Sequence, residues 1–218
     1  MARNPEAVAL ARELRAIAEA LAVSDLQRVD VAEAARLAAE VRRLVDGPRR
    51  ERWYEAGGGL DLSPASRRAY LEQSPIRGRL NPVAPPLELE TVTRPDGTKA
   101  VAGHVRMGRR YEGPPHGVHG GWVAALFDEV CGAVQGLVGG SRVTAVLKVR
   151  YRHLTPLDEE LRFEGWAMEQ RGRRLVAKAT CHAGDTLTAQ AQALMGEVDF
   201  QEVEQQMLGR RSRASDGE

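Results

Sequence analysis

The sequence has few of the residues that cross-link, anchor or export a protein. Its 218 residues include two cysteines, Cys131 and Cys181, which are too few and too far apart for a disulfide framework or a zinc site. No run of eighteen apolar residues is present, and the N-terminus lacks the continuous apolar core of a secretory signal. We therefore expect a cytoplasmic protein with reduced thiols, no bound metal and no membrane span.

Aromatic residues and charge of one sign are also scarce. Aromatic residues make up 5% of the chain, so an aromatic-lined pocket is not obvious. Lysine and arginine number 31 against 30 acidic residues, and the net charge of +1 provides no basic surface for nucleic acid. Hydrophobic residues reach 43%, which is ample for a folded core in one or two domains.

Helical and strand-like segments occupy different parts of the chain. Apolar residues at helical spacing predict a helical hairpin over residues 1–46, whereas residues 47–80 read as an irregular linker with one short helix. Residues 81–200 predict an α+β domain in which one helix covers an antiparallel sheet, and residues 201–218 read as a tail that is basic after Gln206. Within this domain we expect a helix at about 120–138 and strands at 87–93, 99–106, 143–153, 160–170, 173–182 and 186–198.

The predicted long helix has no ordinary water-facing side. With ~100° per residue, its apolar half should pack on the sheet. This half contains Trp122, Val123, Leu126, Phe127, Val130, Ala133, Val134, Leu137 and Val138. The opposite half contains Gly121, Ala124, Ala125, Asp128, Cys131, Gly132, Gln135 and Gly136. Because small residues allow another backbone or a ligand to approach closely, we expect this half to face a partner subunit or a substrate channel.

The start of this helix carries the most informative motif. His119 precedes a pair of glycines, and Asp128 follows nine positions later. The first turn of a helix offers free N–H groups and a partial positive charge, and a carboxylate can act as a general base or a nucleophile. This combination predicts acyl chemistry on a polarised carbonyl.

The motif and the strand after it resemble a known family. GPPHGVHGGWVAALFDEVCG followed by VTAVLKVRYRHLTPL is similar to the hotdog-fold acyl-CoA thioesterases of the phenylacetyl-CoA thioesterase-like group, over about residues 81–199. The resemblance implies a hotdog fold, a curved antiparallel sheet wrapped around one long helix, in a homodimer or a dimer of dimers. It also implies hydrolysis of acyl-CoA thioesters, with coenzyme A as part of the substrate and no separate cofactor.

The resemblance assigns roles to individual residues. It implies that Asp128 is the nucleophile or the base, and that the N–H of Gly121 polarises the thioester carbonyl. It implies that His119 shapes the loop and contacts the thioester, and that Thr144 helps to hold the attacking water. The expected substrate-binding residues are Gly113, His116, Gly120 and Trp122. Two of them depart from the family pattern: Gly113 replaces an Asn of some relatives, and His116 replaces the glycine of their GPPG loop, so His116 is a candidate substitute contact.

The spacing of the motif also predicts how the site is assembled. At ~1.5 Å per residue, Gly121 and Asp128 lie about 10 Å apart on one helix. A reacting carbonyl needs its oxyanion donor and its nucleophile or water each within ~3 Å. Two antiparallel copies of the helix can satisfy this requirement, so we expect a site shared between subunits if both groups act together.

Other interpretations stay open at this point. Asp128 could be a structural carboxylate, and the protein could be a non-catalytic acyl-CoA-binding sensor or scaffold. A dehydratase pairs its His and Asp on a different motif, which we do not find. Strand alternation places Thr144 with Lys148 and Arg150, opposite Leu147. Glu129, at the edge of the apolar half, is expected to pair with an arginine.

Overall fold

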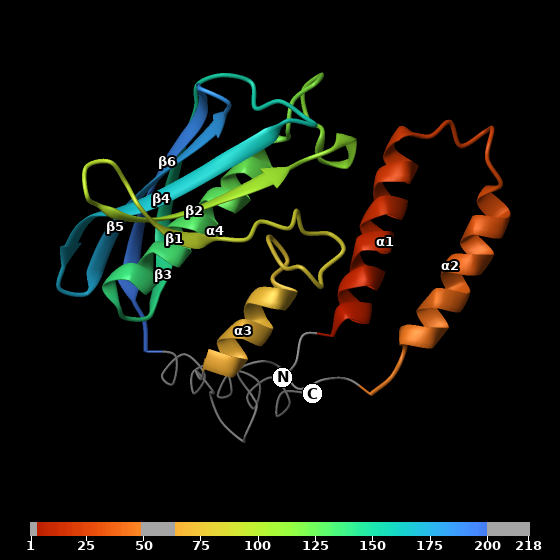
Figure 1. The fold of residues 1–218 in the computed structure, drawn as a ribbon, viewed down its shortest axis with the longest axis horizontal. Coiled ribbons are helices and arrows are strands. Elements are labelled where there is room, and N and C mark those ends of the chain that lie inside the picture. Colours follow the sequence, from red (N-terminus) through yellow and green to blue (C-terminus); the bar gives the residue numbers. More distant parts are fainter. Residues whose placement is uncertain (1–3, 49–63, 200–218) are drawn as a thin grey trace, which may run out of the picture.

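The computed structural model describes residues 4–48 and 64–199 and shows a helical N-terminal part beside an α+β domain (Figure 1). The first part contains α1 (Pro5–Val23), α2 (Val31–Val45) and α3 (Pro64–Gln73). The domain contains β1 (Glu90–Thr93), β2 (Lys99–Arg106), the 3-10 helix η1 (Arg109–Tyr111), α4 (Gly120–Val138), β3 (Arg142–Tyr151), β4 (Glu160–Arg171), β5 (Arg174–Ala183) and β6 (Thr186–Glu197). The predicted tail, 201–218, lies outside the described residues.

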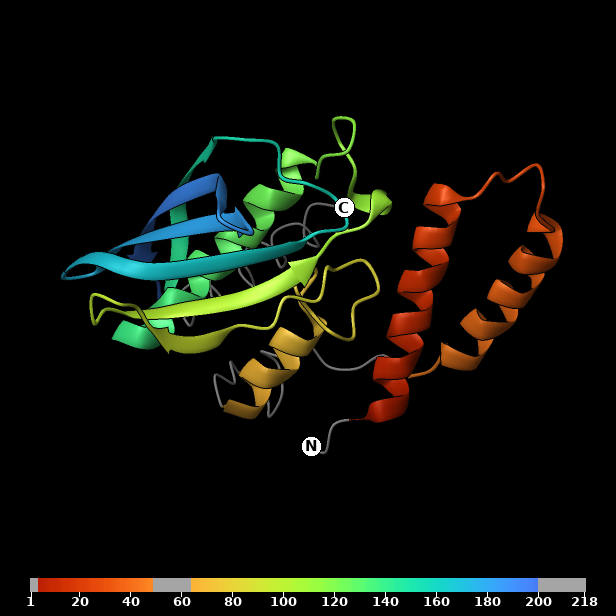
Figure 2. The ribbon, with the colours of Figure 1, turned by 45° about the horizontal axis from the view of Figure 1, so that its top comes forward.

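The six strands form one antiparallel sheet in the order β1-β2-β4-β5-β6-β3. Helix α4 lies across its concave face, as both views show (Figure 2). This arrangement confirms the predicted hotdog fold with an N-terminal helical extension. By length and composition α4 is apolar enough to cross a membrane, but its apolar face covers the sheet, as in the core helix of a soluble protein.

Close packing between α4 and the sheet depends on small residues in the strands. The inward positions of β5 and β6 are largely alanine, and all are buried: Ala177, Ala179, Ala189, Ala191 and Ala193. On β4, a Cβ added at Gly165 would lie 2.7 Å from Cγ1 of Val130, so only glycine fits beneath the helix. Between the helix and these strands, the rings of Phe127 and Phe163 pack edge to face with their centroids 5.3 Å apart. Each such buried large side chain contributes about 1.5–3 kcal/mol.

The expected apolar half of α4 faces the sheet, with one correction. Val123, Leu126, Phe127, Val130 and Val134 are fully buried, as predicted. Cys131, which the helical wheel placed on the small-residue half, is also fully buried in the core. The curved sheet wraps further around the helix than a flat partner would, because β6 reaches the side on which Cys131 lies.

A β-bulge in β3 overturns the predicted orientation of Thr144. The register of β3 against β6 shifts between Thr144 and Val146, so Ala145 is the extra residue. Thr144 pairs with Met195 and Leu147 with Ala193, and both partners are buried inward-facing residues. Residues paired directly opposite share a face of the sheet. Thr144 therefore lies on the same face as Leu147, toward α4, and not with Lys148 and Arg150 as strict alternation predicted.

An ion pair anchors the segment after α3 to α4. Nε of Arg77 donates to a carboxylate oxygen of Glu129 at 2.7 Å, and these side chains are only 12% and 15% exposed. The hydroxyl of Ser74, which is buried, donates to the other Glu129 oxygen at 3.1 Å. The prediction that Glu129 pairs with an arginine is confirmed.

Removing this carboxylate should destabilise the protein. We expect Glu129→Ala to lower the free energy of unfolding by roughly 2–4 kcal/mol, because Arg77 and Ser74 would then lack their partner in a poorly hydrated site. Urea unfolding measures this change. Glu169→Ala is the matched control, since Glu169 pairs with Arg171 on the surface, where loss of a pair costs about 1 kcal/mol or less. Equal effects of the two substitutions would show that the Glu129 pair does not hold the segment.

Candidate active site

The predicted site residues fall into two groups along α4. Asp128 and Thr144 line a pocket at the middle of the helix. The other candidates lie at the helix start or in the loop before it: Gly113, His116, His119, Gly120, Gly121 and Trp122. None of these six lines the pocket. Within one chain the structure therefore keeps the two groups apart, as the spacing of the motif predicted.

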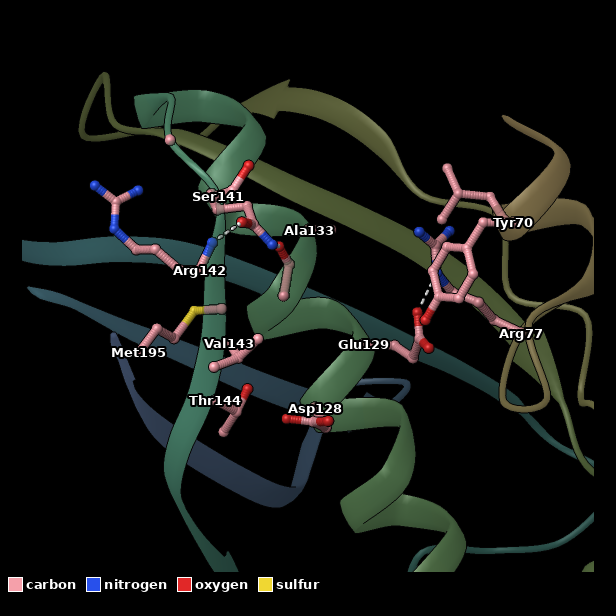
Figure 3. A pocket seen from close by; sticks show the side chains of 14 residues that line it. Tyr70, Arg77, Asp128, Glu129, Ala133, Ser141, Arg142, Val143, Thr144 and Met195 are labelled. Atoms are coloured by element: carbon pink, nitrogen blue, oxygen red, sulfur yellow. Dashed lines mark hydrogen bonds and ion pairs between the residues drawn. The ribbon is translucent and has the colours of Figure 1, made fainter. Parts of the chain in front are cut away.

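The pocket has a volume of about 500 Å³ and lies between α3, α4 and the beginning of β3 (Figure 3). The carboxylate of Asp128 points toward the hydroxyl of Thr144 across it. Asp128 is exposed and Thr144 is half-buried, so a water molecule or a ligand can reach both. The β3 bulge creates this arrangement, because it turns Thr144 toward the helix.

The far wall of the pocket comes from a segment that sequence reasoning treated as a linker. Tyr70 and Leu71 of α3 line it together with Arg77. In Figure 3 the Tyr70 ring lies beside Glu129. Burial, and then the negative charge of Glu129, raise the pKa of Tyr70, so its phenol stays protonated at neutral pH. The sequence predicts a short helix near residues 65–71 but carries no signal that this helix borders a site.

His119 caps the helix that carries the motif. Its side-chain Nδ1 accepts a hydrogen bond from the backbone N–H of Gly121 at 3.0 Å, and its backbone N–H donates to the carbonyl of Tyr111 at 2.8 Å. Within the described residues no hydrogen bond uses the N–H of Gly120, the first residue of α4. The expected oxyanion donor, Gly121, is thus held by His119, while its neighbour Gly120 presents an open N–H.

The loop before α4 is shaped by close contacts. A Cβ added at Gly113 would lie 2.7 Å from Cα of His119, so glycine at this position lets the loop fold back against the motif histidine. His116 has a φ of 63°, in the left-handed region that favours glycine, which fits its place in the pattern of the family loop. Its side chain is exposed, and its N–H donates to Glu112 at 3.0 Å.

Trp122 supports the helix start from beneath. Its ring meets that of Tyr111 edge to face, with the ring centroids 5.0 Å apart, and it packs against the core. The hydroxyl of Tyr151 donates to the carbonyl of Gly120 at 2.7 Å. The aromatic rings of Trp122 and Tyr151 therefore fix the first turn of α4 from two sides.

The cysteines do not offer a nucleophile. Burial raises the pKa of Cys131 to about 12 and that of Cys181 to about 11, so both thiols are neutral at physiological pH. In the two described segments, no group of three or more His, Cys, Asp or Glu side chains is arranged to hold a metal ion. The chemistry available in the pocket is that of a carboxylate beside a hydroxyl.

Comparison with known proteins shows which family this chain resembles. The sequence model of the Thioesterase superfamily matches residues 116–190. The crystal structure of protein RHA08564, a thioesterase superfamily protein, is 28% identical, with a TM-score of 0.68, and the match covers 86% of this chain and 93% of that one. This share is too large for residues 64–218 alone, so the similarity extends into the N-terminal helices. No curated protein matches the chain.

Two further structures match about half of the chain. The conserved protein PA5202 from Pseudomonas aeruginosa is 26% identical, covers 50% of this chain and 88% of its own, and has a TM-score of 0.44. A hypothetical thioesterase from Streptococcus pneumoniae TIGR4, crystallised with coenzyme A, is 20% identical, covers 52% and 91%, and has a TM-score of 0.45. The domain that contains residues 116–190 therefore matches the Thioesterase superfamily in sequence and has the hotdog fold.

Proposed function

We propose that this protein hydrolyses acyl-CoA thioesters at sites shared between two subunits. The observation that carries the proposal is that Asp128 and Thr144 line one pocket, two helical turns from the open N–H of Gly120 and from the N–H of Gly121, which His119 caps. The distance along the helix, about 10 Å, prevents one chain from serving one carbonyl with both groups. A second, antiparallel copy of α4 supplies the missing half of each site.

The accessible surface of the chain supports such a pairing. Among the strands of the described residues, β3 pairs with β6 alone and forms an edge of the sheet. Val143, Val146 and Tyr151 on this strand are large apolar side chains that the monomer leaves exposed. Apart from Cys131, the small-residue half of α4 is also not buried. An apolar sheet edge beside a helix face without charged side chains, Asp128 excepted, is suited to a homodimer.

In the proposed reaction, the thioester oxygen lies at the start of α4 of one subunit. There the N–H of Gly120, joined by that of Gly121 once the substrate displaces the His119 ring, stabilises the developing oxyanion. Asp128 of the other subunit, with Thr144, orients a water molecule and accepts its proton as the oxygen attacks the carbonyl carbon. The tetrahedral intermediate then expels the thiolate of coenzyme A, which takes up a proton, and releases the free acid.

The pocket beside Asp128 is the proposed compartment for the acyl group. Its walls combine Tyr70 and Leu71 of α3 with Gly132 and Ala133 of α4. Gly132 has no side chain and Ala133 only a methyl group, so the helix leaves the volume open. About 500 Å³ suits a compact acyl group. The two buried free cysteines fit a reducing compartment, and we keep the cytoplasm as the proposed location.

Loss of the carboxylate charge should remove turnover without unfolding the protein. We expect Asp128→Asn to lower kcat by about 10²–10⁴-fold, because the amide cannot accept the proton of water. Release of free thiol from a panel of acyl-CoAs measures the rate. Wild type that binds acyl-CoA without releasing thiol would instead identify a non-catalytic acyl-CoA-binding protein.

Mixed dimers test whether the site is shared. In Gly121→Pro the donor N–H is lost at a position in the first helical turn that tolerates proline, and Gly121→Ala is the control that keeps it. Co-expression of Asp128→Asn with Gly121→Pro should restore about a quarter of wild-type turnover, since half of the random dimers contain one intact composite site. If no activity returns in the mixture, although the chains exchange, each site is built within one chain.

Substitution of His119 by alanine distinguishes its role as a helix cap from a role in the reaction. We expect His119→Ala to cost about 1 kcal/mol of unfolding free energy through loss of the cap, and to lower kcat by less than about tenfold, because the N–H of Gly121 becomes free. The control is His116→Gly, which suits the positive φ of that residue. A loss of kcat as large as that of Asp128→Asn would show that the imidazole takes part in the reaction.

The ring of Tyr70 should limit the acyl group. We expect Tyr70→Ala to shift kcat/KM by roughly tenfold in favour of longer or bulkier acyl-CoAs, because it opens the α3 wall. Tyr70→Phe, which keeps the ring, should leave the preference nearly unchanged. Identical acyl-chain profiles for Tyr70→Ala and wild type would show that the acyl group does not reach α3.

A further inference from the structure

Helix α1, which lies outside the domain matched by the superfamily, contacts the segment that leads into the catalytic helix (Figure 2). From these contacts we infer that Glu19 of α1 is a positioning residue for the active site, with Arg15 of the same helix holding it in place. The inference rests on the proposed thioesterase function. It makes the helical extension a support of the catalytic loop and not a separate docking module.

The carboxylate of Glu19 caps η1 from another part of the chain. One Glu19 oxygen accepts from the N–H of Arg109 at 2.7 Å, and the other from the N–H of Arg110 at 3.4 Å. The residue before η1 is Gly108, which has no side chain to make this cap. A Cβ at Gly108 would lie 2.6 Å from an oxygen of Glu19, so the glycine leaves the space that the carboxylate occupies. An acidic group is the favoured partner for the first N–H groups of a helix.

Arg15 fixes α1 to the loop between α3 and β1. Its guanidinium donates to the carbonyls of Gly78 at 3.2 Å, Asn81 at 3.1 Å and Ala84 at 3.2 Å, and also to that of Arg79. A guanidinium can satisfy several carbonyls at once because its five N–H donors are held in one plane. Glu19, one helical turn further on, is thus presented to η1 from an anchored helix.

Arginine 110 joins α1 and this loop to η1. Its guanidinium donates to the carbonyl of Arg15 at 3.2 Å and to that of Pro82 at 3.2 Å. The Arg110 side chain is only 14% exposed. Because η1 is fixed on one side by its capped N–H groups and on the other by this guanidinium, its position depends on α1.

The end of η1 transmits this position to the catalytic helix. The carbonyl of Tyr111 accepts the N–H of His119 at 2.8 Å, and the Tyr111 hydroxyl donates to the carbonyl of Val83 at 3.0 Å. The Tyr111 ring packs edge to face on Trp122 in the first turn of α4. His119 in turn holds the N–H of Gly121. Two hydrogen bonds therefore link the Glu19 carboxylate to His119, which caps the proposed oxyanion donor: one from the N–H of Arg110 to Glu19, and one from the N–H of His119 to the carbonyl of Tyr111.

Substitution of Glu19 in the full-length protein tests the inference. We expect Glu19→Ala to lower kcat by roughly tenfold or more while KM changes by less than about twofold, because misplaced oxyanion donors weaken transition-state binding selectively. Glu19→Gln keeps an acceptor oxygen and should recover part of kcat. The control is Glu13→Ala on the same helix, which removes only an exposed ion pair with Arg12 and should behave like wild type.

Gly108→Ala provides an independent variant. The added methyl group would displace the Glu19 carboxylate and should reproduce the effect of Glu19→Ala. If the methyl group acts through Glu19, the double variant is no slower than the worse single variant. Additive losses, or wild-type kcat in Glu19→Ala, would overturn the inference.

Hydrogen exchange gives a readout that does not require turnover. Amide exchange of residues 109–121 should accelerate in Glu19→Ala and not in Glu13→Ala, whereas exchange in β5 and β6 should stay unchanged. Unchanged exchange at 109–121 would overturn the positioning role. If wild type releases no thiol from any acyl-CoA, the proposed function fails, while this exchange pattern still decides whether α1 holds the loop.

Discussion

The close approach of α4 to the sheet is the constraint on which the rest of the structure depends. Alanines along β5 and β6 and a glycine at position 165 let the helix lie deep in the curved sheet, so that its apolar face is fully covered. The same depth brings Asp128 level with the beginning of β3, where the pocket forms. A floor of larger side chains would lift the helix and separate the carboxylate from Thr144.

The fold and the two groups of site residues could be predicted from the sequence because each has a local signature. Helical and alternating patterns gave the elements, and a rise of ~1.5 Å per residue placed Gly121 and Asp128 too far apart for one carbonyl. Three features had no local signature. The bulge at Ala145 depends on pairing with β6, and the burial of Cys131 depends on the curvature of the sheet. The pocket wall at Tyr70 depends on the ion pair between Arg77 and Glu129, which anchors the segment after α3.

At the start of α4, the residues of the proposed catalytic motif also have structural roles. His119 caps the helix, Gly113 gives the loop room to pass, and Tyr111 and Trp122 hold the first turn from beneath. Of the N–H groups in the first turn of α4, those of Gly121, Trp122 and Val123 bond to His119, and that of Gly120 makes no hydrogen bond within the described residues. The helical extension joins this group through Glu19, so a segment remote in sequence belongs to the surroundings of the motif in space.

Side chains along a strand alternate between its two faces with a period of two residues, and the extra residue in β3 shifts this alternation once. Thr144 before the shift and Leu147 after it both face inward, although their positions differ by three, an odd number. Deletion of Ala145 would restore strict alternation with Thr144 two positions from Leu147, so Thr144 would still pair with Met195 and face inward. The bulge therefore takes up the one extra residue that, under strict alternation, would turn the Thr144 hydroxyl away from the site.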